Sequence, residues 1–155
     1  MRSFHNHTVE VTRYHNQSGT DFGYMGKKAA DRLMAAGIHH VLVGHQPAGD
    51  APMFIRQDGA PLIVNADSSY CLVGSPTGRG SAVSDVVVDT ATHLVTCNSI
   101  RADGSVVSAN SSDLNIGSRT ADGWWIKAVG PDGRYLAQHT QDMCMHIDYK
   151  WIQNL

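Results

Sequence analysis

The residues best suited to chemistry lie where an apolar run from Val41 ends in Gly44-His45. In open α/β sheets, ligands bind beyond the carboxyl ends of the strands, so a histidine just after a strand is well placed to hold a metal ion. Gly44 lets the backbone turn and Pro47 fixes the next loop, so His45 would be held rigidly from both sides. Neutral imidazole suits zinc, iron and manganese. The alternative is a buried histidine bonded to a backbone carbonyl, which the spacing alone favours.

A helix and a strand must position His45. From Gly26 to Ala36, apolar residues recur at helical spacing, which predicts a helix. Gly37 stands where a left-handed helix cap is wanted. The run Val41-Leu42-Val43 then predicts a buried strand that stops at Gly44. A helix joined to a strand by two or three residues is typical of an α/β layer.

From residue 53 onward the chain is rich in short β-type runs separated by turns. The dipeptides Asp58-Gly59, Asp103-Gly104 and Asp132-Gly133 mark tight turns, and the second predicts a hairpin. Residues 108–120 are rich in Ser, Asn and Gly, which indicates a loop or linker. We therefore expect an α/β (α+β) fold with a β-rich C-terminal half. The predicted strands are Met53–Ile55, Leu62–Val64, Ala82–Val88, Leu94–Thr96 and Trp124–Ile126, with further strands in the tail up to Leu155.

Composition excludes several classes of protein. The formal net charge is −2, so the chain lacks the basic surface that nucleic-acid binding requires. No apolar run reaches the length of a membrane span, and the N-terminus has no apolar signal region. Cys71, Cys97 and Cys144 are odd in number and widely spaced, which favours reduced thiols. We expect a globular cytoplasmic protein without membrane or nucleic-acid partners.

Three blocks of the chain resemble the late part of the calcineurin-like metallophosphoesterase family, which includes the serine/threonine protein phosphatases. In that family a Phe-Gly precedes a helix, and a strand then ends in a metal-binding histidine. A later strand and loop end in Asn-Tyr-Cys, where this chain has Ser69-Tyr70-Cys71, and paired strands close the sheet. The matching blocks are Thr20–Gln46, Leu62–Cys71, and Gly80–Asp89 with Leu94–Cys97.

The resemblance implies the C-terminal part of a metallophosphoesterase β-sandwich with flanking helices. Residues 1–107 would be a partial domain of this family, residues 108–120 a loop or linker, and residues 121–155 a β-type extension. The implied activity is hydrolysis of a phosphoprotein or a small phosphoester by two divalent ions of manganese, iron or zinc that share a hydroxide.

The resemblance also assigns roles to single residues. His45 matches the histidine that completes the shell of the second metal, and Tyr70 matches a tyrosine that overhangs the active site and contacts the substrate. The alternative for Tyr70 is a half-buried aromatic residue that closes the sheet edge. Asp50 and Asp67 lie near this edge, and we interpret both first as turn or cap residues.

The chain lacks the other motifs of the family. Asp-x-His, Gly-Asp-x-x-Asp and Gly-Asn-His are absent, and Arg13 is the nearest arginine to the place of a phosphate clamp. A single imidazole cannot hold a divalent ion, since such sites need three or more protein ligands. The late strands alone would also expose apolar surface. We therefore expect this chain alone to be inactive. The exposed surface would be covered by an N-terminal half outside the chain, by a protein partner, or by the chain's own residues 117–155.

Two further hypotheses stay open. The chain could be a catalytically inactive phosphoesterase-like binding module, with Trp124, Trp125 and Trp151 as anchors for a protein partner. Core packing is the favoured alternative for these tryptophans. The chain could also be an unrelated small α+β or all-β protein in which Gly44-His45 is a coincidence.

Overall fold

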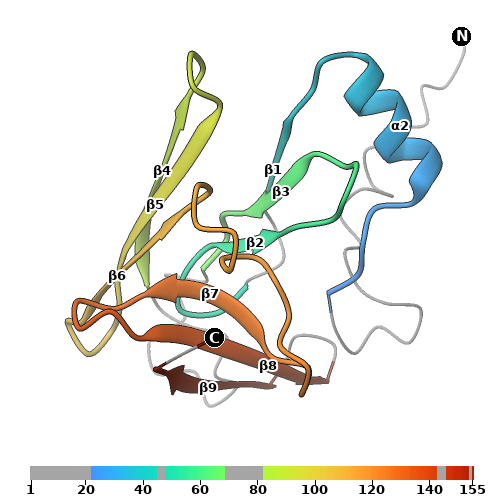
Figure 1. The fold of residues 1–155 in the computed structure, drawn as a ribbon. Helices are drawn as coiled ribbons and strands as arrows, with labels where there is room; N and C mark the ends of the chain where they lie inside the picture. Colours follow the sequence, from blue (N-terminus) through green and yellow to red (C-terminus); the bar gives the residue numbers. More distant parts are fainter. Residues whose placement is uncertain (1–21, 45–47, 69–81, 143–145, 154) are drawn as a thin grey trace, which may run out of the picture.

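The computed structural model describes residues 22–44, 48–68, 82–142, 146–153 and 155. These residues form a mixed α/β fold that is rich in strands, which lie in a three-stranded and a six-stranded sheet (Figure 1). The mixed fold with its β-rich second half is as predicted. The described elements are α2 (Lys27–Ala35), β1 (His40–Val43), β2 (Met53–Ile55), β3 (Leu62–Asn65), β4 (Val83–Asp89), β5 (Leu94–Ile100), β6 (Val106–Asn110), β7 (Trp125–Val129), β8 (Tyr135–Asp142) and β9 (His146–Ile152).

Helix α2 confirms the sequence pattern closely. Its buried Ala30 and half-buried Leu33 pack into the core around the small sheet, while Lys27 pairs with Asp31 one turn later at 2.8 Å in solvent. The helix ends at Ala35, and Gly37, just after the cap residue Ala36, has a φ of +74°. Ile38 N–H donates to the Leu33 carbonyl at 2.9 Å and Gly37 N–H to the Met34 carbonyl at 3.0 Å, the pattern of a Schellman cap.

The small sheet has the order β1-β3-β2, with β1 parallel to β3 and β2 antiparallel to it. The prediction of a buried strand at residues 41–43 is wrong in one respect. Among the described strands β1 pairs with β3 alone and lies at the edge of the sheet. Leu42 is accordingly 50% exposed, whereas the alternate Val41 and Val43 pack toward the core. The buried strands of this sheet are β2 and β3.

His40, at the start of β1, should make the stability of the folded chain depend on pH. Burial lowers the pKa of His40 below its ordinary value of 6.5, and the neighbouring His93 and His39 lower it further, against a hydrogen bond with the His93 backbone. The unfolded chain therefore binds a proton near pH 6.5 that the folded chain does not yet bind, so stability should fall as pH falls through this range. Replacing His40 by Gln should make this decline shallower, as measured by urea unfolding at pH 8.5, 7.5, 6.5 and 5. Between pH 7.5 and 8.5 the variant and the parent should have the same slope, and an equal slope at pH 5–6.5 would contradict the assignment.

The large sheet is antiparallel, in the order β4-β5-β6-β7-β8-β9. The predicted hairpin is confirmed, since Ile100 faces Val106 across the turn at Asp103-Gly104. β6 and β7 share a single register pair, Ser108 with Val129, and the long connection between them folds back toward β2 (Figure 1). Strands from residues 1–107, 108–120 and 121–155 thus lie in one sheet, and the division into domains stays a prediction.

The core lies between the two sheets. Phe54 of β2 and Val64 of β3 pack against the inward residues of the large sheet, all almost fully buried, which include Val95, Val107, Ile126 and Leu136. Outside the core, Val83, Ile100 and Val106 are neighbours across β4, β5 and β6, and each is about half exposed.

Cys97 is the cysteine that the structure describes. It is a free thiol in the core, and burial raises its pKa to about 12, so it is unreactive. Among the described residues, no helix has both the length and the apolar character needed to cross a membrane.

Candidate functional site

The segments that follow the parallel strands β1 and β3 meet at one edge of the small sheet. Ala66 N–H donates to the Val43 carbonyl at 2.9 Å, and Ala48 N–H donates to the Asp67 carbonyl at 2.7 Å. The buried Asn65 side chain accepts the Asp67 N–H at 3.2 Å, which fixes the turn after β3. We call this region the carboxyl edge. It is the place where open α/β sheets bind their ligands.

Both residues to which the sequence assigns a site role, His45 and Tyr70, lie outside the described residues. The strands that lead to them are β1 and β3, which are direct neighbours in the sheet. Gly44, just before His45, is exposed. Ser68, two residues before Tyr70, is buried and donates its hydroxyl to the Ala82 carbonyl at 2.7 Å.

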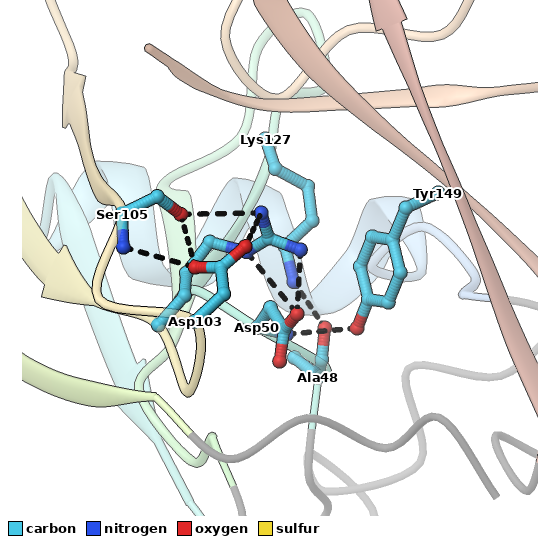
Figure 2. A network of polar contacts seen from close by, with 7 residues as sticks. Ala48, Asp50, Asp103, Ser105, Lys127 and Tyr149 are labelled. Carbon is cyan, nitrogen blue, oxygen red and sulfur yellow. Dashed lines mark hydrogen bonds and ion pairs between the residues drawn. The ribbon is translucent and has the colours of Figure 1, made fainter. Parts of the chain in front are cut away.

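The turn Ala48–Asp50 is clamped against the large sheet (Figure 2). Lys127 of β7 donates to the Ala48 carbonyl, and Asp50 N–H donates to the Tyr149 hydroxyl at 2.8 Å. Gly49 has a φ of +91°, and a Cβ there would collide with the Tyr149 hydroxyl and lie 2.9 Å from Gln138 Oε1. Only glycine fits between these two side chains, so the turn has a single position relative to β8 and β9.

Asp50, in the same turn, forms a nearly buried ion pair with Arg101. Arg101 Nη2 and Nε lie 2.9 and 3.2 Å from Asp50 Oδ2, and the two side chains are only 14% and 15% exposed. Arg101 also reaches Asp103 at 3.4 Å and Ser105 at 3.3 Å, and it lies over the Tyr149 ring. Asp50 lies in a bend, which agrees with its interpretation as a turn residue. Its ion-pair partner, Arg101, lies 51 residues further along the chain.

The protonation states of Tyr149 and Asp103 are consistent with a structural role for this network. Burial raises the pKa of Tyr149, and the Asp50 charge raises it further, so the phenol stays neutral. Hydrogen bonds from Ser105 lower the pKa of Asp103, so this carboxyl stays charged. Tyr149 is therefore a positioning residue and no base at neutral pH.

The network also includes Lys127, which was not among the predicted site residues. Lys127 is fully buried, which is rare for lysine unless the ammonium is paired or hydrogen-bonded. Its signal was a lysine inside the apolar run Trp124-Trp125-Ile126-Lys127-Ala128. Arg101 and Tyr149 carried no such signal, because their neighbours in sequence do not reveal what they contact.

The described residues do not form a metal centre by themselves. Within them, no group of three or more His, Cys, Asp and Glu side chains could hold an ion. The ring of His93 lies 5.1 Å from that of His39 and 6.3 Å from that of His40. Further ligands would have to come from residues that the structure does not describe or from another polypeptide.

Comparison of the chain with protein-family models, with curated proteins and with solved structures finds no match. What the structure establishes is the class: a mixed α/β protein with a parallel strand pair, β1 and β3, and a rigidly supported turn at their carboxyl ends.

Proposed function

We propose that the chain is the C-terminal part of a metal-dependent phosphoester hydrolase of the metallophosphoesterase class, with the carboxyl edge facing the substrate. One observation carries the proposal. The segments after β1 and β3, which lead to His45 and Tyr70, are held side by side by the hydrogen bond from Ala48 to Asp67. The two sheets would then be late strands of that family's sandwich, in a cytoplasmic protein whose thiols stay reduced.

In this proposal the chain's residues fall into two groups. His45 would be one ligand of the metal pair, and Tyr70 would contact the phosphoester. Asp50, Arg101 and Tyr149 are positioning residues, because they fix the turn three residues after His45. When bound, a pair of manganese, iron or zinc ions would supply the nucleophilic hydroxide and neutralise charge on the phosphoryl group.

The test uses manganese and p-nitrophenyl phosphate, on this chain and on the same chain extended by the residues encoded upstream of Met1. We expect hydrolysis from the extended chain only, because one imidazole cannot hold the ions. Replacing His45 by Ala in the extended chain should lower kcat at least about 100-fold, since loss of a ligand disrupts the metal pair. The readout is the manganese-dependent rate, together with manganese content after desalting.

Lys28→Ala is the matched control, because Lys28 lies on the exposed face of α2, and it should leave the rate unchanged. The proposal fails if the upstream sequence lacks Asp and His metal motifs. It also fails if the His45 variant of the extended chain keeps full manganese-dependent hydrolysis.

The second candidate is a catalytically inactive binding module. It is favoured by the finding that the described residues hold no three-ligand group while the edge is rigidly supported. Trp125 is fully buried, which confirms core packing for this residue. Trp124 and Trp151 are half-buried, under Lys150 at 4.3 Å and Arg134 at 5.3 Å, and could still anchor a partner. Tight binding of two manganese ions per chain in calorimetry would exclude this candidate.

A further inference from the structure

A second site lies at the opposite end of the small sheet. A pocket of about 450 Å³ opens where the β2–β3 turn meets residues 114–119, and its lining includes Tyr24, Arg56, Asp58, Leu114 and Arg119. It adjoins the amino end of β3, one strand length, about 13 Å, from the carboxyl edge. Its volume falls within the range of small-molecule sites.

Arg56 brings a half-buried positive charge to this pocket. Its guanidinium donates to three backbone carbonyls, those of Ile116 at 2.7 Å, Ser111 at 2.5 Å and Asp113 at 3.2 Å. Among the described residues, no carboxylate lies within ion-pair distance of Arg56. Burial lowers the pKa of Arg56, although the more distant Asp113 opposes this. The carbonyls fix the direction of the guanidinium but do not neutralise it, so an anion in the pocket would be stabilised.

Trp125 holds two further walls of the pocket in place. The ring of this buried residue carries Arg119 at 5.4 Å on its face and meets the Tyr24 ring edge-on at 5.9 Å. Arg119 also donates to the Gly123 carbonyl at 3.0 Å. A cation and an aromatic ring are thus held at one side of the pocket before any ligand arrives, which lowers the entropic cost of binding.

We propose that this pocket binds a small aromatic monocarboxylate, with its carboxylate on Arg56 and Arg119 and its ring against Tyr24 and Leu114. The charged side chains that line the pocket are those of Arg56, Arg119 and Asp58. Guanidinium groups bind carboxylates through paired, charge-assisted hydrogen bonds. Leu114 is 75% exposed and Tyr24 56% exposed, so a ring placed there would cover apolar surface that now faces water. The site is independent of the proposed hydrolase activity.

The experiment is a titration of the full chain with phenylacetate, followed by ¹H–¹⁵N chemical shifts. We expect saturable shifts at residues 56–58 and 117–119, with a Kd on the order of 0.1–1 mM for a ligand of this size. The neutral phenylacetamide should bind at least about tenfold more weakly, because it loses the charge-assisted hydrogen bonds. Binding should also weaken when salt is raised, since the pocket is open to solvent.

Arg119→Gln is the decisive variant, because Arg119 is exposed and its replacement should leave the fold intact. It should weaken phenylacetate binding at least about fivefold. The matched control is Arg134→Gln, which removes an arginine that lies over Trp151 at 5.3 Å and outside the pocket, and it should bind as the parent does. The proposal is overturned if shifts at the pocket do not saturate, if phenylacetamide binds equally well, or if the two variants lose affinity alike.

Discussion

Replacing Gly117 by alanine is expected to lower the free energy of unfolding by about 3 kcal/mol, through left-handed strain and overpacking together. Gly117 has a φ of +82°, which an L-residue adopts only with strain. A Cβ there would lie 2.9 Å from Phe54 Cβ and 3.1 Å from the Phe54 carbonyl carbon and oxygen. Since most of these contacts are with backbone, a rotamer change cannot relieve them.

The position of Gly117 makes this cost hard to avoid. Gly117 N–H donates to the Ile126 carbonyl at 2.8 Å, and its carbonyl accepts the Arg56 N–H at 3.1 Å. The residue therefore joins β7 of the large sheet to the end of β2 in the small sheet. A backbone shift that makes room for a methyl group would stretch one of these hydrogen bonds, so the strain should weaken the contact between the sheets.

Gly104→Ala separates the two causes. Gly104 has a similar φ of +79°, but nothing lies within 4 Å of the Cβ that would be added. This variant should cost only the backbone strain, about 1 kcal/mol. Urea unfolding of both variants, with unchanged m-values, measures the difference. Equal losses for Gly117 and Gly104 would show that the close approach to Phe54 has no energetic consequence.

Removal of Arg101 is the second change that we expect to lower the free energy of unfolding strongly. Arg101→Ala should lower the free energy of unfolding by about 3 kcal/mol, because breaking a nearly buried ion pair leaves Asp50 without this cation in a desolvated position. The guanidinium also supports Asp103 and Ser105 in the β5–β6 turn and covers the Tyr149 ring. The loss should therefore exceed that of any ordinary surface pair.

A double-mutant cycle tests the origin of this effect. The losses in Arg101→Ala and Asp50→Ala should not add, and the double variant should recover at least about 1 kcal/mol of coupling. Lys27→Ala is the control, since it breaks the exposed pair with Asp31, whose side chains are 86% and 57% exposed. That variant should change stability by only about 0.5 kcal/mol. Additive losses for Asp50 and Arg101 would mean that the two residues act separately.

The disruption of this ion pair also bears on the proposed function. The pair fixes the turn after His45, so in an active extended chain Arg101→Ala should lower the hydrolysis rate. Binding of phenylacetate at the distant pocket should be unchanged as long as the variant stays folded. The two proposals can therefore fail or succeed independently.

Local sequence patterns were enough to predict the helix, its cap and the turns. Helical spacing and Gly37 placed α2 and its cap, and the Asp-Gly dipeptides placed the turns, including the hairpin at Asp103-Gly104. These features depend on the φ preferences and side-chain periodicity of neighbouring residues, which sequence shows directly. The third block of resemblance implied that its two runs pair, and β4 does pair with β5, in antiparallel orientation.

Which of these elements contact one another is seen only in the folded chain. Among the described strands β1 lies at an edge, and the six strands from β4 through β9 form one sheet. Lys127 is buried, and Asp50 pairs with Arg101, which lies 51 positions later. The pocket beside Arg56 likewise depends on a loop some 60 residues further along the chain. Burial and pairing at such separations depend on how the two sheets pack. Apart from the apolar neighbours of Lys127, the residues on either side of each partner do not indicate them.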